Sequence, residues 1–340
     1  MYKMGLIGAG AVVRGAHVPL LKERQDLDVV AVADPVEENR KAVGEVLGCG
    51  ALFDDYRRVL DHPEIQAVDI CLPHFMHEEA VLAAFDAGKD VILEKPIAIT
   101  LCEADRMIAA ALDKGRRFYV SLNQRFCPAH RKVKAILDSG EYGRPFLVLT
   151  HVIGDEFARM NDAASWKGSW DRAGGGALGD TGTHVIDLML WWFGRPQTVS
   201  CQWGRFLVEP ETKADDNVCV TLGYPGMLAE VVVCYSALSD PWTEDKHIYF
   251  RDDSLHVKID IEQPLSHGRS KEAPEVIELE PVLPNWWTHS VSRSLNHFID
   301  CLQGRAEPAY GPEAARETLE IILMAYRAAE ERKTLLVGGC

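Results

Sequence analysis

Basic residues are in short supply in this 340-residue sequence. Lysine and arginine together number 36, against 51 aspartates and glutamates, which gives a formal net charge of −15. Because a protein that binds nucleic acid neutralises phosphates with surplus basic residues, the charge argues against a nucleic-acid partner. Long apolar runs are also missing, since none approaches the ~18 residues needed to cross a bilayer. We therefore expect no membrane span.

The sequence has no pair of cysteines at the C-x-x-C spacing, which argues against a zinc ribbon or a thioredoxin-like motif. Its nine cysteines are odd in number and scattered along the chain. The first residues lead directly into an apolar strand and lack the layout of a signal peptide. We therefore expect free thiols, no metal and a reducing cytoplasm.

The remaining composition is that of a globular protein, with 47% hydrophobic and 26% charged residues. At about 150 residues per domain, the length favours two domains. Residues 1–122 alternate apolar strand patterns with helical ones, which is typical of an α/β Rossmann domain with a parallel sheet. Residues 123–340 carry longer strand-like runs separated by turns, which predicts an α+β domain with an open, mostly antiparallel sheet. Its last two helices, about 288–303 and 312–331, are candidates to pack back on the first domain.

A glycine-rich turn follows the first predicted strand and opens the first helix. In Gly8-Ala-Gly10, the first glycine permits a tight turn and the second lets a pyrophosphate approach the backbone. The free N–H groups of the helix start, including those of Ala11 and Val12, can then bind the phosphates. A plain turn between a strand and a helix is the alternative for so short a motif.

The acidic residue Asp34 strengthens the dinucleotide interpretation. It ends the second predicted strand, at the distance expected for a ribose-binding carboxylate. A carboxylate there accepts a hydrogen bond from the 2′-hydroxyl of NAD and repels the 2′-phosphate of NADP. Since Pro35 and Val36 follow it, rather than an arginine, we predict NAD over NADP.

The turn Glu94-Lys95-Pro96 places a lysine just past the carboxyl end of another predicted strand. Ligands bind at that edge of open α/β sheets, and a lysine there can donate a hydrogen bond to a substrate hydroxyl. An ordinary solvated lysine is the alternative.

The second domain contains a run of glycines followed by acidic and histidine residues. If the chain is helical from Leu178 onward, Asp180 and His184 are four residues apart and Asp187 lies on the same side. A carboxylate beside an imidazole raises its basicity and suits general-base catalysis. The alternatives are a metal site built from these three residues, or a capping aspartate with a core histidine.

A tryptophan-bearing loop precedes the glycine run. Trp166 offers an aromatic face for a sugar ring, and Arg172 offers hydrogen bonds to hydroxyl groups. The loop therefore suits the wall of a substrate pocket, although packing of tryptophan against the sheet or another subunit explains it equally well.

Taken together, these motifs resemble the Gfo/Idh/MocA family of nicotinamide-dependent oxidoreductases over nearly the whole chain. Besides the motifs above, the resemblance rests on Leu72-Pro73-His74 with His77, and on Asn123-Gln124-Arg125-Phe126. It implies a catalytic triad of Lys95, Asp180 and His184. It further implies cofactor contacts from Leu72, Pro73, His74, His77, Glu94 and Lys95, and substrate contacts from Asn123, Arg125, Trp166, Arg172, Asp180 and His184.

The resemblance implies transfer of a hydride between NAD and a ring carbinol or ketone of a sugar, amino sugar or cyclic polyol. Two alternatives remain: a redox-neutral, NAD-dependent glycosidase of the same family, and a non-catalytic sensor of NAD and sugar. The family's open sheet also implies a homodimer or homotetramer.

Overall fold

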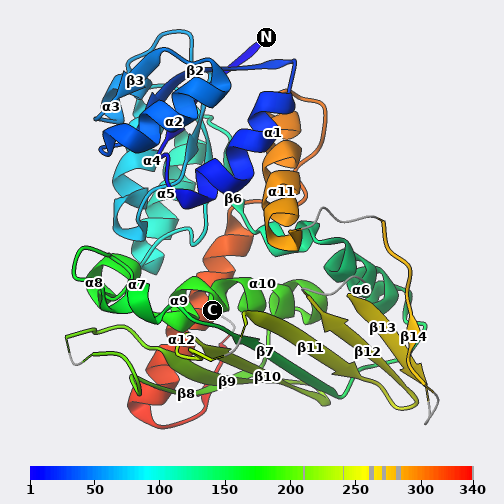
Figure 1. The fold of residues 1–340 in the computed structure, drawn as a ribbon. Helices are drawn as coiled ribbons and strands as arrows, with labels where there is room; N and C mark the ends of the chain where they lie inside the picture. The colour runs from blue at the N-terminus through cyan, green and yellow to red at the C-terminus, as the bar shows by residue number, and fades with distance from the viewer. Residues whose placement is uncertain (210, 240, 260–263, 270–272, 281–284, 339–340) are drawn as a thin grey trace. The chain divides into compact units, whose positions relative to one another are not determined.

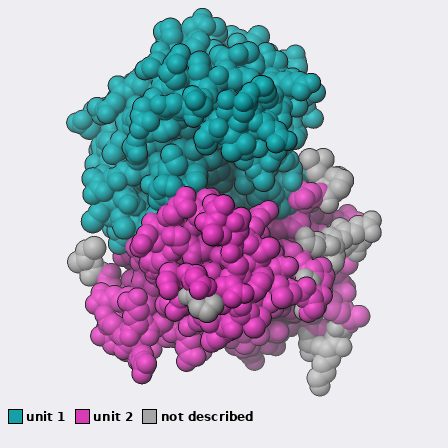
Figure 2. Space-filling model, turned by 60° about the vertical axis from the view of Figure 1, so that its left-hand side comes forward, with its two compact units in different colours: residues 1–123, 287–317 teal, residues 124–286, 318–340 magenta. Residues whose placement is uncertain are grey.

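The computed structural model describes residues 1–209, 211–239, 241–259, 264–269, 273–280 and 285–338. The chain forms two compact units, coloured separately in Figure 2. Unit 1 contains residues 1–123 and 287–317, and unit 2 contains residues 124–286 and 318–340. The sequence placed the boundary after residue 122 and assigned all of 123–340 to the second domain, whereas residues 287–317 group with the first unit.

Unit 1 is built on a six-stranded parallel sheet with strand order β3-β2-β1-β4-β5-β6. Figure 1 labels β2, β3 and β6 of this sheet. Its strands are β1 (Tyr2–Ile7), β2 (Leu27–Ala33), β3 (Ala51–Phe53), β4 (Ala67–Ile70), β5 (Asp90–Glu94) and β6 (Phe118–Ser121). The order is that of a Rossmann fold, and the strand order reverses between β1 and β4. The predicted fold class of the first domain is therefore confirmed.

Apart from one helix that comes from the end of the chain, the helices of unit 1 lie in sequence between successive strands of the sheet. They are η1 (Val13–His17), α1 (Val18–Glu23), α2 (Glu37–Leu47), α3 (Arg57–Leu60), η2 (His74–Met76), α4 (His77–Asp86), α5 (Leu101–Asp113) and, from the end of the chain, α11 (Trp286–Leu302). The start of α5 is held by a capping box, in which the Thr100 side chain accepts from Glu103 N and the Glu103 carboxylate accepts from Thr100 N.

Helix α11 belongs to unit 1 from Trp287 onward, although it lies far from that unit in sequence. The Phe298 ring stacks on Tyr119 of β6, with ring centroids 4.8 Å apart. The Ser292 hydroxyl donates to the Ala16 carbonyl at 2.8 Å. These contacts explain how a late helix completes the Rossmann unit.

Unit 2 carries a nine-stranded sheet with order β14-β13-β12-β11-β7-β10-β9-β8-β15. All neighbouring strands are antiparallel except β7 and β10, which run parallel, so the predicted mostly antiparallel sheet is confirmed. The strands are β7 (Leu147–Ile153), β8 (Thr198–Gly204), β9 (Asn217–Tyr224), β10 (Met227–Cys234), β11 (Thr243–Tyr249), β12 (Asp253–Lys258), β13 (Leu265–Arg269), β14 (Glu275–Val276) and β15 (Leu335–Leu336).

The two faces of this sheet differ because side chains alternate along each strand. The inner face is buried and largely apolar, with Val148, Val152, Val220, Val231 and Ile248, and it also holds the ion pair of Lys246 with Glu244. The face on the other side is half-buried or exposed. We call it the outer face, and it includes Leu149, His151, Glu230, Asp245, His247 and His256.

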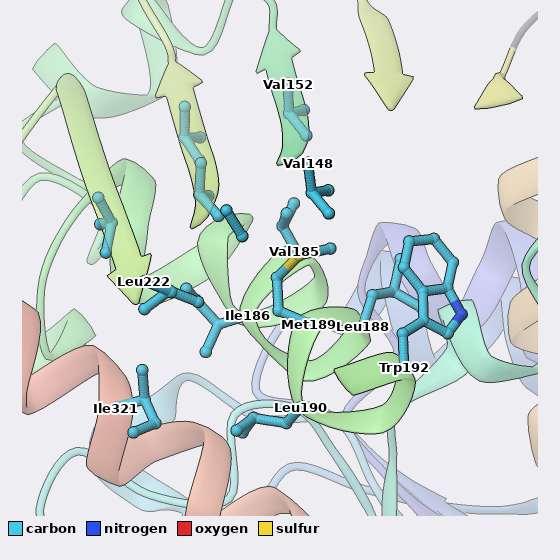
Figure 3. Packing of buried hydrophobic residues seen from close by; sticks show 14 of the residues in the cluster. Val148, Val152, Val185, Ile186, Leu188, Met189, Leu190, Trp192, Leu222 and Ile321 are labelled. Atoms are coloured by element: carbon cyan, nitrogen blue, oxygen red, sulfur yellow. The ribbon is translucent and has the colours of Figure 1, made fainter. Parts of the chain in front are cut away.

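The inner face is covered by helices of unit 2. These are α6 (Pro128–Ser139), α7 (Phe157–Asn161), α8 (Trp170–Ala173), α9 (Ala177–Asp180), α10 (Gly182–Phe193) and α12 (Glu313–Glu331); a short helix, η3 (Asn123–Phe126), lies in sequence at the boundary between the units. Figure 3 shows α10 with Val185 and Met189 near Val148 of β7, and with Leu190 facing Ile321 of α12. Ten of the twelve residues of α10 are buried, so the helix is a firmly packed support for the residues at its start.

The eight cysteines within the described residues are free, and Cys340 lies outside them. No helix in the described ranges is both long enough and apolar enough to span a bilayer.

Candidate functional site

The glycine-rich turn lies at the carboxyl end of β1. Gly8 has a φ of +97°, and a Cβ there would lie 2.1 Å from the Cys71 carbonyl oxygen, so only glycine fits. A Cβ at Gly10 would have nothing within 4 Å, which leaves open space beside this part of the backbone. Because the helix begins at Ala11, its first N–H groups border that space. The turn therefore has the room and the donors that a pyrophosphate requires.

Asp34 directly follows β2 and is 8% exposed. Its Oδ2 accepts from Ala9 N at 2.7 Å, and its Oδ1 accepts from Val36 N at 2.8 Å. The carboxylate therefore ties the glycine turn to the loop after β2. This tie is a role that the sequence did not predict.

Arg40 lies beside the same loop and was missed from sequence. Its Nη1 donates to the carbonyl oxygens of Asp34 and Pro35, at 3.1 and 3.2 Å. An arginine near this position accommodates a 2′-phosphate in NADP-binding relatives of the Rossmann fold. The cofactor prediction used only Pro35 and Val36, the two residues that follow Asp34. Arg40 lies in the first turn of α2, and its side chain reaches back to the loop.

The Leu72–His77 segment follows β4, at the same edge of the sheet. Leu72 and Pro73 are half-buried, and His74 is buried at the start of η2. The ring nitrogens of His77 lie 2.9 Å from the Pro96 and Leu72 carbonyl oxygens. His77, predicted to contact the cofactor, thus joins the loops that follow β4 and β5, and burial lowers its pKa.

Glu94 and Lys95 lie at the carboxyl end of β5, and both are half-buried. Beneath them, His17 Nδ1 lies 2.6 Å from Asp69 Oδ2, and His17 Nε2 lies 3.3 Å from Glu94 Oε1. Burial opposes the charge on His17, but the attraction of Asp69 outweighs it and raises the pKa of His17 well above its ordinary value. We call these three residues the His17 cluster.

The His17 cluster also sets the state of Glu94. Burial raises the pKa of Glu94, but the hydrogen bond and charge of His17 outweigh burial and lower it overall. Glu94 is therefore a fixed carboxylate adjacent to Lys95. The cluster was missed from sequence because His17 meets Asp69 across 52 residues.

In unit 2, the glycine run is held by a buried aspartate that the sequence did not single out. Asp215 Oδ1 accepts from Gly176 N at 2.7 Å, and Oδ2 accepts from Leu178 N at 3.0 Å. The Tyr326 hydroxyl donates to the same carboxylate at 2.6 Å. A Cβ at Gly176 would lie 1.9 Å from the Asp215 backbone oxygen, so the close approach requires glycine there.

Asp180 ends α9, and His184 lies in the first turn of α10. The helix predicted to be continuous from Leu178 is interrupted by a turn at Thr181. Asp180 N still bonds Gly176 O at 3.0 Å and His184 N bonds Thr181 O at 3.0 Å, so the backbone around both residues is fixed.

The Asp180 carboxylate holds two donors. Lys167 Nζ lies 2.6 Å from Asp180 Oδ2, and the Tyr235 hydroxyl donates to the same oxygen at 3.0 Å. Burial lowers the pKa of Lys167, but Asp180 and Glu156 outweigh it and raise the pKa overall. Burial, followed by the charge of Asp180, raises the pKa of Tyr235 well above its usual value. We call Asp180, Lys167 and Tyr235 the Asp180 cluster.

Asp187 lies on α10, three residues after His184. It forms an ion pair with Arg125, whose Nη2 lies 2.6 Å from Asp187 Oδ1. Within the described part of the chain, the groups of His, Cys, Asp and Glu close enough to share a metal ion include neither Asp180 nor His184. The structure therefore gives the metal alternative no support, and Arg125, predicted to bind substrate, has a structural partner.

The remaining predicted substrate residues differ in burial and in the unit to which they belong. Asn123 is 1% exposed and donates to the Ser290 hydroxyl at 2.7 Å within unit 1. Trp166 is half-buried in the loop that also carries Lys167, and Arg172 is exposed on α8. Of these residues, Trp166 directly precedes Lys167, a member of the Asp180 cluster, in the sequence.

Comparison with known proteins agrees with this architecture. Residues 2–122 match a family described as "Oxidoreductase family, NAD-binding Rossmann fold", and residues 130–251 match the "GFO/IDH/MocA C-terminal domain". The chain belongs to the GFO/IDH/MocA family. Its curated relatives in this family include named dehydrogenases that act on sugars and diols.

Two such relatives illustrate the range. Levoglucosan dehydrogenase of Pseudarthrobacter phenanthrenivorans is 36% identical over 219 residues, which cover 61% of this chain and 55% of that protein. D-apiose dehydrogenase of Paraburkholderia graminis is 25% identical over 342 residues, which cover 98% of this chain and 89% of that protein. For the first of these the chain spans little more than half of the relative's length.

Solved structures of the GFO/IDH/MocA fold align over the whole chain. A levoglucosan dehydrogenase in complex with NADH has a TM-score of 0.88 at 22% identity and covers 100% of both chains. The WlbA dehydrogenase of Bordetella pertussis, in complex with NADH and UDP-GlcNAcA, has a TM-score of 0.85 at 20% identity and covers 100% of this chain and 98% of that one. At such identities the likeness establishes the shared fold.

Proposed function

We propose that this protein is an NAD-dependent oxidoreductase that acts on a ring hydroxyl or ketone of a sugar, amino sugar or cyclic polyol. The observation that carries the proposal is the Asp180 cluster, in which Asp180 holds Lys167 and Tyr235 four residues before His184. The same chain has a glycine turn that suits a dinucleotide. The substrates named for the curated relatives support the same class.

The cofactor would be held by the edge of the unit 1 sheet. Gly8, Gly10, Ala11 and Val12 would face the pyrophosphate, and Asp34 the adenosine ribose. When bound, the nicotinamide supplies the site that accepts or returns a hydride. The residues fit this group, because the turn is open at Gly10 and a carboxylate ends β2.

Asp34 favours NAD over NADP in this proposal, because its charge repels a 2′-phosphate. Arg40 acts in the opposite direction, since its guanidinium lies at the same loop. We expect Asp34 to determine the cofactor preference, because its carboxylate directly follows β2, where a Rossmann fold binds the ribose.

In unit 2, His184 would take the proton of the substrate hydroxyl as general base, and Asp180 would orient the substrate or the imidazole. From unit 1, Lys95 would donate a hydrogen bond to the developing alkoxide. Lys167 would keep Asp180 ionised, and Tyr235 would hold one carboxylate oxygen in place. Trp166 and Arg172 remain candidates for contacts to the sugar ring.

The half-exposed outer face of the unit 2 sheet supports a homodimer or homotetramer, because a large sheet face without a covering layer favours association. The free cysteines support residence in a reducing cytoplasm.

The test is a panel of free sugars, anhydrosugars, inositols and glycosides, each with NAD or NADP, followed by the absorbance of the reduced nicotinamide. We expect reduction of NAD with at least one free sugar or cyclic polyol. Cleavage of a glycoside without accumulation of NADH would instead establish the redox-neutral glycosidase. Binding of NAD and sugar without turnover of any compound would establish the sensor.

A further inference from the structure

Three polar side chains converge on the outer face of the unit 2 sheet, where the proposed oxidoreductase chemistry has no use for them. His247 Nε2 lies 3.1 Å from Asp245 Oδ1, and His256 Nε2 lies 2.7 Å from the same oxygen. The three ligand atoms all lie within 4.8 Å of one another. All three side chains retain access to solvent, with 35% of His247, 34% of His256 and 13% of Asp245 exposed.

The strand pairing produces this convergence. His247 of β11 lies directly opposite His256 of β12, and their rings stack with centroids 3.8 Å apart and planes 16° apart. Asp245 precedes His247 by two residues, so it points to the same face of the sheet. Since both ring nitrogens contact one oxygen of Asp245, the two imidazoles present their Nε2 atoms on the same side.

Two imidazoles and one carboxylate form a donor set typical of zinc sites that keep an open position. Zinc binds histidine nitrogen at about 2.0–2.1 Å and carboxylate oxygen at about 2.0–2.2 Å, so ligand atoms on one ion lie about 3–3.5 Å apart. The observed separations from Asp245 Oδ1 are close to that range. We propose that Asp245, His247 and His256 bind a divalent transition-metal ion of the zinc class.

Neighbouring residues suit such an ion. His151 of β7 lies directly opposite Asp245 on the other side of β11, so it is the nearest candidate for a fourth ligand. Calcium and magnesium prefer oxygen ligands, so the two histidines select against them.

The site would not take part in hydride transfer. Helix α10, which carries His184, packs on the inner face of the sheet, and the metal ligands lie on the outer face. Bound metal would instead join β11 to β12 and stabilise this part of the sheet.

A second group of possible ligands, in unit 1, provides a contrast. His17, Asp69 and Cys71 also bring three ligand atoms together, but His17 and Asp69 are 1% exposed and already form an ion pair. Asp245, His247 and His256 are partly exposed in the single chain, and two of the three are imidazoles, which is why we assign the metal to unit 2.

The experiment is calorimetric titration of the chelator-treated full chain with Zn²⁺, with Co²⁺ absorption spectra as an independent readout of the ligand set. We expect one ion per chain in the wild type. Because loss of even an indirect partner of a metal ligand costs about 10- to 100-fold in affinity, His247→Asn and His256→Asn should each cost at least that much.

His267→Asn is the matched control. His267 is also a histidine paired with a carboxylate, Asp253 at 2.8 Å, and it lies on the neighbouring strand β13 outside the proposed set. This variant should bind Zn²⁺ as the wild type does and should keep the Co²⁺ spectrum. The proposal is overturned if the wild type binds neither ion, if His247→Asn and His256→Asn bind as the wild type, or if His267→Asn loses binding to the same extent.

Discussion

The His17 cluster of unit 1 and the Asp180 cluster of unit 2 both hold ionised groups away from bulk water, but they are built differently. In unit 1 an imidazole lies between two carboxylates, and its side chain is 1% exposed. In unit 2 one carboxylate holds a lysine and a tyrosine, and 22% of Lys167 and 15% of Asp180 remain exposed.

The different exposure of the two clusters suits them to different roles, one structural and one catalytic. An enclosed group such as His17 can fix the geometry of its neighbours, here Glu94 and through it the start of the Lys95 turn. A charged group that reaches solvent can also meet a ligand. We therefore expect changes in the His17 cluster to affect mainly stability, and changes in the Asp180 cluster to affect mainly turnover.

The largest effect on stability is expected from His17→Leu. This substitution leaves Asp69 and Glu94 buried without their cation, and loss of one partner from a buried pair costs about 3–5 kcal/mol. Denaturant unfolding, followed by circular dichroism, measures the change. A free energy of unfolding equal to that of the wild type would show that the cluster does not hold unit 1 together.

A smaller effect, on turnover rather than on stability, is expected from Lys167→Met. Hydrogen bonds to charged groups contribute about 1.5–3 kcal/mol, so kcat/KM should fall by about 10- to 150-fold while stability changes less than in His17→Leu. The acid limb of the pH profile of kcat should move to higher pH, because the Asp180 carboxylate loses the cation of Lys167. Lys167→Arg should restore part of the activity; equal kcat values for Lys167→Met and wild type would contradict the role of the Asp180 cluster.

The pH dependence of stability sharpens the comparison further. The pKa of His17 is raised above 6.5, so its contribution is complete below that pH and is lost as pH rises through the folded value. The pKa of Glu94 is lowered below 4.5, so its contribution is complete above that pH and is lost as pH falls through the folded value. The cluster should therefore contribute fully between about pH 4.5 and 6.5. Unfolding measured across pH should show an alkaline decline that is absent in His17→Leu.

The smallest effect is expected at Arg40, an arginine that contacts backbone rather than a buried charge. Arg40→Ala should raise the preference for NAD over NADP by about two- to fivefold, since an exposed ion pair contributes up to about 1 kcal/mol. Kinetics with both cofactors measure the ratio. An unchanged ratio would mean that Arg40 only supports the loop.

Sequence reasoning recovered the features that depend on residues close together in the chain. The capping box of Thr100 and Glu103 spans three residues, and the turn at Gly8 follows directly from its strand. Short strands such as β3 and β13 were not predicted, because segments of three to five residues carry too little pattern.

The partners of the site residues could not be predicted, because they come from distant parts of the chain. Arg125 meets Asp187 across 62 residues, and Tyr235 meets Asp180 across 55. Only the folded sheet and helices determine such pairs. For this reason the pairing of Asp187 with Arg125 and the roles of Lys167, Tyr235 and Asp215 were missed.

The central claim is that Lys95 and His184 act on the substrate hydroxyl. The most direct measurement is the rate of NADH formation by Lys95→Ala and His184→Ala on the best compound of the panel, in variants that retain NAD binding. Because a positioned acid–base group contributes about 10²- to 10⁴-fold, each variant should lose at least about 10²-fold in kcat. Near wild-type turnover by both variants would contradict the account.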